Sequence, residues 1–178
     1  MAASILWSTP LDKRISSATR EVALFGMLGG LTFAAKVVMM GLPNIEPVSL
    51  LVLLFAVTLG KKALFPIYVY VLLEFALFGI GLWSISYIYL WPLLALVAWL
   101  LRFMRSPLGW AVVAGTFGLL FGALCAPVYL LAGGPAFALS WWVSGIPFDL
   151  THCAGNFFLT LFLFCPLRRL LSRVFPPM

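Results

Sequence analysis

The chain has 178 residues, of which 64% are hydrophobic and 9% charged, with a formal net charge of +6 at pH 7. Soluble domains carry about 45–50% apolar and about 25% charged residues, so this sequence has too little polar surface to cover a water-soluble protein. The composition excludes a soluble enzyme or binding domain, and it predicts an all-α polytopic membrane protein.

The apolar runs predict six membrane-spanning helices, because a spanning helix needs roughly 20 mostly apolar residues. The joints between the runs are short and rich in Pro, Gly and charge, and long polar loops are absent. We therefore expect one compact six-helix bundle, a single integral membrane domain over residues 1–178. The predicted spans are about 21–41, 47–60, 63–82, 86–102, 109–132 and 142–167.

Lys and Arg predict the orientation of this bundle. Ten of the eleven basic residues fall before the first span, after the last, or in alternate joints, and therefore on one side of the membrane. The positive-inside rule places that side, with both termini, in the cytoplasm. The net charge thus reflects topology and is no evidence for nucleic-acid binding. No convincing cleavage site follows the first apolar run, so we expect no cleavable signal peptide.

The first span carries a stripe of small residues on one face. Gly26, Gly30 and Ala34 recur at intervals of four, a pattern that lets another helix approach closely. Thr32 and Lys36 fall roughly on the opposite face at 100° per residue. The stripe is compatible with docking a partner protein or with packing inside the same bundle, and the sequence does not decide between them.

The first outer joint places an acid between two prolines. Pro43 and Pro47 predict an extended or turned path. This path would bring Asn44 and Glu46 to the rim of a binding pocket. Alternatively, Glu46 only caps the second span, because an acid is favourable at a helix N-terminus.

Four ionisable residues fall within the predicted spans, in their middle or outer half: Lys36, Glu74, Asp149 and His152. Such residues cost roughly 2.5–3.5 kcal/mol each at a helix centre, and they usually pair or mark a site. Lys36 could pair with Glu74 or Asp149 only to hold the bundle together, or it could bind a ligand.

Asp149, His152 and Asn156 share one helical face. Pro147 predicts an irregular start to this last helix, with free backbone groups near Asp149. The outer joints also collect aromatic residues, among them Trp83 and Trp141, and Tyr87 lies at the start of the fourth predicted span. Aromatic residues often serve only as interfacial anchors, but together with the polar residues they predict the walls of a pocket for a flat ligand.

Several chemistries lack their motifs. The sequence contains no GxxxxGK[ST], HExxH or GxSxG pattern, so we expect neither nucleotide hydrolysis nor these hydrolase chemistries in this chain. Cys125, Cys153 and Cys165 show no metal-ligand spacing, and we interpret them as small buried hydrophobes. Asp149 and His152 alone make a poor metal site. We expect no metal and no cofactor in this chain.

Three segments resemble the substrate-binding S component of energy-coupling factor (ECF) transporters, the bacterial vitamin-uptake systems. They follow a short basic N-terminus and the small-residue stripe of the first span, and the resemblance covers about residues 15–172. The segments are LPNIEPVSLL, YVLLEFALFGIGLWSISYIYLWPLL and GALCAPVYLLAGGPAFALSWWVSGIPFDLTHCAGNFFL.

The resemblance implies a six-helix protein of the bacterial plasma membrane that is not itself an enzyme. It implies a pocket near the outer face and partnership with a transmembrane T component and two cytoplasmic ATPases. Members of the family contact the T component through small residues of the first helix, here Gly26, Gly30 and Ala34. The metal-transporting branch normally starts with Met-His, whereas this chain starts Met-Ala-Ala, so we expect a vitamin or related micronutrient rather than a metal ion. The outer aromatic and acidic residues favour a flat heterocycle with hydrogen-bond donors or positive charge.

Two other functions remain open from the sequence. A stand-alone carrier or channel would use Glu74, Asp149 and His152 as a proton relay. A small membrane enzyme acting on lipid or isoprenoid substrates would use Asp149 and His152 as acid and base. The identity of the transported compound does not follow from these residues.

Overall fold

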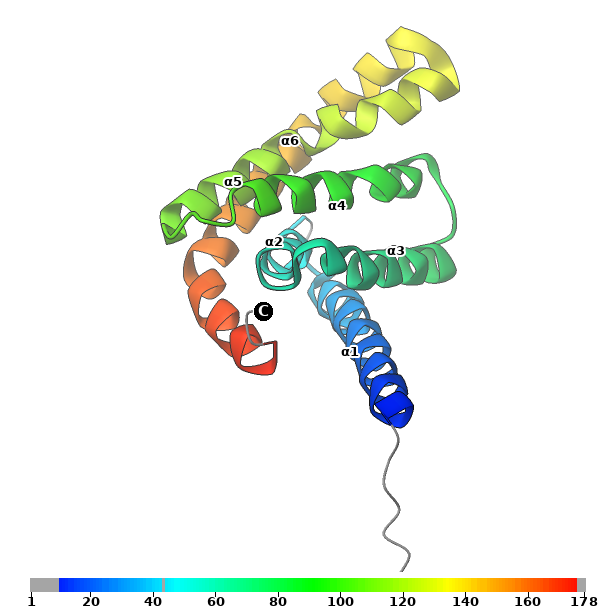
Figure 1. The fold of residues 1–178 in the computed structure, drawn as a ribbon. Coiled ribbons are helices and arrows are strands. Elements are labelled where there is room, and N and C mark those ends of the chain that lie inside the picture. Colours follow the sequence, from blue (N-terminus) through cyan, green and yellow to red (C-terminus); the bar gives the residue numbers. More distant parts are fainter. Residues whose placement is uncertain (1–9, 43, 176–178) are drawn as a thin grey trace, which may run out of the picture.

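The computed structural model describes residues 10–42 and 44–175, and within these ranges the chain is helical, without a β-strand. Figure 1 shows the order of the elements along the chain. They are α1 (Pro10–Met39), α2 (Val48–Leu59), the short 3₁₀ helix η1 (Gly60–Ala63), α3 (Leu64–Phe78), α4 (Leu82–Leu100), α5 (Pro107–Leu119) and α6 (Phe121–Val174).

Four helical stretches of the described chain are long and apolar enough to cross a membrane. This confirms the prediction of an all-helical protein whose helices are long and apolar enough to span a membrane. The six predicted spans do not appear as six separate stretches, because two of the four stretches are longer than one predicted span. The stretches are Ala18–Met39, Val48–Phe78, Leu82–Leu100 and Pro107–Val174.

The long helix α6 consists of two arms joined at Gly134. This glycine has φ 80° and ψ −177°, a conformation that side-chain-bearing residues rarely adopt. The first arm (121–133) and the second arm (135–174) run side by side, and the chain reverses between them in Figure 1. Pro135 opens the second arm, where the missing N–H of proline costs no hydrogen bond.

The second arm corrects one prediction about the last span. We expected the last span to begin at about residue 142, with an irregular first part near Pro147. The helix instead starts directly after Gly134 and continues through Pro147 with helical backbone angles. Trp141, interpreted as part of an outer joint, therefore lies within the helix.

Glycines let α5 and the first arm approach the second arm of α6 closely. A Cβ added at Gly118 would lie 2.8 Å from the backbone carbonyl of His152, and one added at Gly122 would lie 2.5 Å from Asp149 Oδ2. At Gly115 the nearest atom would be 3.3 Å away, on Phe157. The three glycines fall on one helical face, and the absence of their side chains lets the second arm approach closely, through the His152 backbone at Gly118 and through side-chain atoms of Asp149 and Phe157 at Gly122 and Gly115.

Serine and proline shape the start and the middle of α4. The helix begins at Leu82, before the predicted start at 86, because Ser84 belongs to its first turn: the Gly81 N–H donates to Ser84 Oγ at 2.8 Å. Pro92 lacks the N–H that would bond the carbonyl of Ile88. The Tyr68 hydroxyl of α3 donates to that carbonyl instead, at 3.2 Å.

Helix α2 is central in the fold, and α1 lies at the periphery. Most of α2 is buried from Val48 to Ala56, and Figure 1 shows it enclosed by the other helices. Helix α1 packs against α3 at Gly29, where an added Cβ would lie 2.6 Å from Val69. At Gly26 and Gly30 an added Cβ would meet nothing within 4 Å, and Ala34 is exposed. The small-residue stripe therefore faces away from the rest of the described chain.

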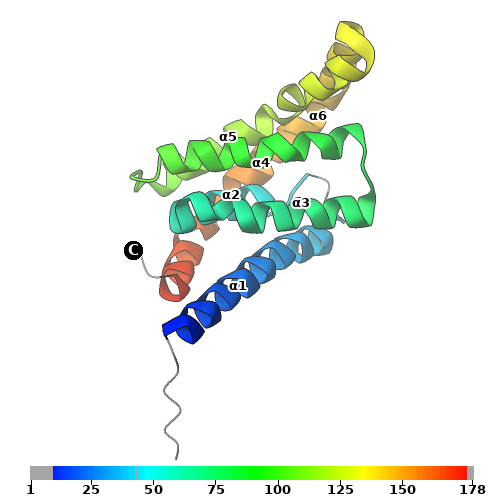
Figure 2. The same cartoon turned by 45° about the vertical axis from the view of Figure 1, so that its right-hand side comes forward.

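The two ends of the molecule differ in charge. The 101–106 connection, η1 and the end of α6 lie toward one end in Figure 2, and the 79–81 connection and the Gly134 reversal lie toward the other. The first end carries the basic residues Lys61, Lys62, Arg102, Arg105, Arg168, Arg169 and Arg173.

A candidate ligand-binding cavity

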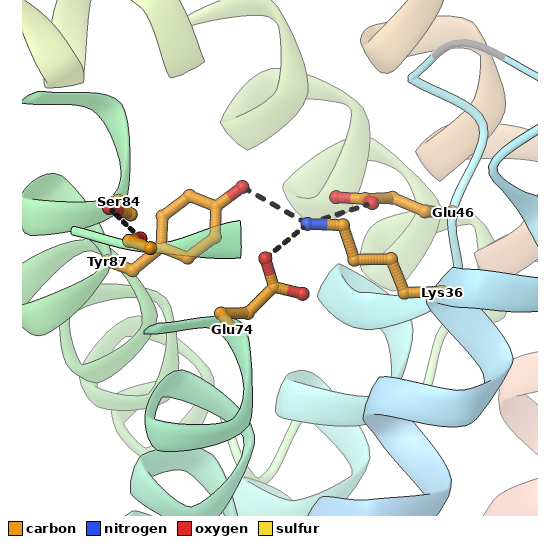
Figure 3. Close-up of polar contacts among 6 residues, drawn as sticks. Lys36, Glu46, Glu74, Ser84 and Tyr87 are labelled. Carbon is orange, nitrogen blue, oxygen red and sulfur yellow. Dashed lines mark hydrogen bonds and ion pairs between the residues drawn. The ribbon is translucent and has the colours of Figure 1, made fainter. Parts of the chain in front are cut away.

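An ion pair between α1 and α3 borders the site. Lys36 Nζ lies 2.8 Å from Glu74 Oε2, and the Glu74 side chain is fully buried. Lys36 Nζ also lies 3.5 Å from the Tyr87 hydroxyl of α4 (Figure 3). Of the two partners considered from the sequence, Lys36 thus pairs with Glu74 and not with Asp149.

Glu46 approaches the same ammonium from the connection between α1 and α2. Its Oε2 lies 3.9 Å from Lys36 Nζ, an ion-pair contact but not a hydrogen bond (Figure 3). Pro47 is the residue preceding α2, no side chain caps this helix, and its first turn contains no acid. The capping role considered for Glu46 is therefore not found. Burial raises the pKa of Glu46, and the Lys36 ammonium partly opposes that rise.

The connection between α1 and α2 is held against the second arm of α6. Asn44 adopts a positive φ of 57°, a conformation that asparagine tolerates better than most residues. An added Cβ at Gly155 would lie 3.2 Å from the Cα of Ile45, so the backbone of the connection contacts the arm directly. Pro43 lies outside the described residues.

Aromatic rings surround the Lys36 ammonium on its other sides. Four ring centroids lie within cation–π distance of Nζ: Tyr87 at 5.3 Å, Phe78 at 5.7 Å, Trp83 at 5.7 Å and Tyr70 at 6.0 Å. Such contacts contribute about 0.5–2 kcal/mol each, more where the cation is desolvated. The ammonium is therefore held by two carboxylates and these rings, and it has little freedom to serve another partner.

A cavity of about 290 Å³ opens beside this cluster, between α4, the two arms of α6 and the α1–α2 connection. We call it the aromatic cavity, because five of its lining side chains are aromatic. Its lining residues include Asn44, Trp83, Tyr87, Phe121, Gly122, Cys125, Trp141, Ser144, Gly145, Phe148, Asp149 and His152. The volume lies near the lower end of the range for small-molecule sites, about 300–1,000 Å³.

Asp149 has one oxygen engaged and one free. The break between α5 and α6 at Leu120 leaves N–H groups unpaired at the start of α6, and the Gly122 N–H donates to Asp149 Oδ1 at 3.0 Å. Asp149 Oδ2 is buried and has no hydrogen-bond partner among the described residues. The carboxylate is thus fixed through one oxygen while the other remains able to accept a bond from a ligand.

His152 lies one helical turn further along the same face. The side chain is 4% exposed, and its ring meets the Phe121 ring edge to face at a centroid distance of 4.9 Å. Nε2 is buried and lacks a hydrogen-bond partner in the described chain. An unpaired buried polar atom costs about 1–3 kcal/mol of stability. A ligand that supplies the missing hydrogen bonds to Asp149 and His152 would remove this cost.

A smaller cavity of about 200 Å³ lies between the aromatic cavity and the ion-pair cluster. Lys36 and Glu46 line it. Four residues line both cavities, namely Asn44, Tyr87, Phe121 and His152. The two cavities therefore adjoin, and together they bring eight of the ten predicted ligand-binding residues to one region.

Glu74 and Asn156, the other two predicted residues, line neither cavity. Glu74 contacts the Lys36 ammonium and does not reach either cavity. Asn156 Nδ2 donates to Ser49 Oγ of α2 at 3.0 Å and to the Ala114 carbonyl of α5 at 3.4 Å. The structure thus places Asn156 as a connection between three helices rather than at the cavity.

Several lining residues were not singled out from the sequence. Phe121, Gly122, Cys125, Ser144, Gly145 and Phe148 line the aromatic cavity. The spacing of Gly115, Gly118 and Gly122 was the available signal, because a small-residue face predicts close helix contact and would have placed Gly122 opposite another helix. Cys125 is buried as expected, but it also borders the cavity.

Comparisons of the chain with models of known protein families, with curated proteins and with solved structures find no match.

Proposed function

We propose that this chain is the substrate-binding S component of an ECF-type importer in a bacterial plasma membrane. It captures a small water-soluble vitamin or related micronutrient from outside the cell. The observation that carries the proposal is the aromatic cavity, in which buried Asp149 and His152 each have an atom without a hydrogen-bond partner in the described chain. Aromatic walls with a few placed polar groups are typical of sites for small organic ligands.

The helical stretches support six crossings of the membrane. A helix of 68 residues is roughly 100 Å long at 1.5 Å per residue, against about 30 Å of hydrocarbon, and Pro107–Val174 reverses at Gly134. Val48–Phe78 is interrupted by η1. The two lysines of η1 would be costly in the bilayer centre, so η1 lies at a membrane surface and the stretch crosses twice.

With six crossings, both termini lie on one side in this proposal, and the positive-inside rule favours the cytoplasm for that side. The cavity residues Asn44, Trp83 and Trp141 then lie toward the outer face, because they are close to the connections that carry no Lys or Arg. A pocket at this end is accessible to an extracellular solute.

The small-residue stripe of α1 supports docking to a membrane partner. A Cβ added at Gly26 or Gly30 would meet no atom within 4 Å, so the space beside these glycines is open to a partner helix, and small residues of this spacing allow a close helix approach. In this proposal the stripe contacts a T component, and two cytoplasmic ATPases supply the energy that this chain, lacking a nucleotide-binding motif, does not.

The test is to purify the tagged chain from its native membranes in mild detergent and to identify the proteins that accompany it. We expect a membrane subunit and ATPase subunits. Inactivating those ATPases should abolish accumulation of the solute in cells while binding by this chain persists. Accumulation by the isolated chain in liposomes, driven by a pH gradient, would instead identify a stand-alone carrier, and turnover of a lipid would identify an enzyme.

A further inference from the structure

The charges around the cavity are unbalanced. Asp149 makes no ion pair with any residue that the structure describes, and neither Lys nor Arg lines the aromatic cavity. The ammonium of Lys36, which lines the adjoining smaller cavity, is already matched by Glu74 at 2.8 Å and approached by Glu46 at 3.9 Å. An anionic ligand would therefore meet an unpaired carboxylate and no free cation.

The unpaired Oδ2 atom of Asp149 favours a ligand that donates a hydrogen bond. Asp149 is 5% exposed, and Oδ1 is bound to the Gly122 N–H, which leaves Oδ2 to accept. An ionised carboxylate only accepts hydrogen bonds, and a charge-assisted bond to it is roughly twice as strong as a neutral one. A ligand N–H group with positive charge supplies both the hydrogen-bond donor and the opposite charge.

The aromatic walls of the cavity favour a flat ligand, and they add to the preference for a positively charged one. Trp83, Tyr87, Phe121, Trp141 and Phe148 present rings to the cavity. Trp141 is held in place by stacking on Tyr129 at a centroid distance of 3.9 Å. Rings favour a flat partner, and their negative faces attract a delocalised cation.

We infer that the aromatic cavity takes a flat, cationic nitrogen heterocycle whose exocyclic amino group donates to Asp149 Oδ2. The inference rests on the proposed function in treating the cavity as the solute site, and it adds the charge of the solute and the direction in which it binds. The amino edge lies at Asp149 and His152, and the ring lies against the aromatic walls.

Three quinoline probes of similar shape test this assignment on the purified full-length chain. 4-Aminoquinaldine carries the amino group and is protonated at neutral pH, quinaldine lacks the amino group, and quinaldate is an anion. Binding is followed by tryptophan fluorescence, since Trp83 and Trp141 line the cavity, and by calorimetry. We expect 4-aminoquinaldine to bind at least about tenfold more tightly than quinaldine, which corresponds to about 1.4 kcal/mol, and quinaldate not to compete.

Asp149→Asn gives a second measurement. Asparagine keeps an oxygen for the Gly122 N–H but places an NH₂ donor where Oδ2 accepts, so the preference for 4-aminoquinaldine over quinaldine should disappear. Glu21→Gln is the matched control, because it makes the same acid-to-amide change at an exposed residue paired with Lys62; this variant should keep the preference. Should Asp149→Asn fail to fold, the probe series on the wild-type chain still decides.

Equal or tighter binding of quinaldate, unchanged preference in Asp149→Asn, or no binding of any probe at 1 mM, about −4.1 kcal/mol, would overturn the inference. The proposed function fails separately. If 4-aminoquinaldine binds as expected but no ATPase accompanies the chain, the ligand class stands and the ECF assignment does not. If ATPase-dependent uptake is found for an anionic solute, the ECF assignment stands and the cationic ligand class does not.

Discussion

Lys36 Nζ of α1 lies 2.8 Å from Glu74 Oε2 of α3 (Figure 3), and four aromatic rings lie within cation–π distance of the same ammonium. A buried charge that loses its partner is left uncompensated, which typically costs about 3–5 kcal/mol. This contact therefore fixes the position of α1, and it keeps the Lys36 ammonium from attracting an anion into the neighbouring cavities.

We predict an asymmetric response when this pair is broken. Lys36→Met leaves Glu74 buried without a partner and should lower the free energy of unfolding by about 3–5 kcal/mol. Glu74→Gln should cost less, because Lys36 keeps Glu46 at 3.9 Å. The double variant should cost less than the sum of the two single variants.

The measurement is unfolding of the four proteins in detergent, followed by circular dichroism. Lys62→Met is the control, since its pair with Glu21 is exposed and exposed pairs contribute only about 0–1 kcal/mol. Strictly additive effects of the Lys36 and Glu74 substitutions would show that the contact carries no coupling energy.

Two helix glycines should respond oppositely to alanine. Gly118→Ala places a Cβ 2.8 Å from the His152 backbone, so the second arm of α6 must shift, at a cost of about 1–3 kcal/mol. Gly30→Ala meets no atom within 4 Å and should be neutral or stabilising by up to about 1 kcal/mol, since alanine favours the helix. Thermal midpoints in detergent compare the two, and equal midpoints would contradict the close contact described at Gly118.

The pH dependence of stability should include a contribution from Glu46. Burial raises its folded-state pKa above the ordinary value of 4.5, so the folded protein binds this proton more tightly than the unfolded chain. Stability from this group is fully present below the unfolded pKa and is lost as pH rises through the folded pKa.

Glu46→Gln should therefore be at least as stable as wild type at pH 7 and should lose this part of the pH dependence. Each unit of pKa shift corresponds to about 1.4 kcal/mol. Thermal midpoints measured from pH 4 to pH 8 for both proteins provide the test. A Glu46→Gln variant that is less stable than wild type only at neutral pH would show that the ion pair with Lys36 outweighs burial.

The sequence was sufficient for the helical class and for much of the site, because both depend on local patterns. Composition and apolar run length predicted membrane-spanning helices, and the cost of buried charge identified Lys36, Asp149 and His152. Helical spacing placed Asn156 on the same face as Asp149. Helical spacing gives the face on which a side chain lies, but it does not show which other helix packs against that face. Asn156 contacts α2 and α5 there instead of the cavity.

Other features depended on contacts between distant segments. The helix restarts at Pro135, whereas the last span was predicted to begin at about residue 142, because Trp141 suggested a joint at the membrane interface. Ser84 was also assigned to a loop, whereas it bonds the Gly81 N–H in the first turn of α4. The role of Gly122 required knowing that Asp149 lies opposite, 27 residues along the chain.

The most direct test of the account is whether the aromatic cavity holds a small solute. Native mass spectrometry of the protein purified from its own membranes should show one small molecule bound per chain. Gly145 lines the cavity, and an added Cβ there meets nothing within 4 Å, so Gly145→Leu should fill the space without strain and abolish the bound mass. Gly26→Leu, at an equally open helix position outside the cavity, should retain it. A wild-type chain without bound solute, or equal occupancy in Gly145→Leu, would contradict the account.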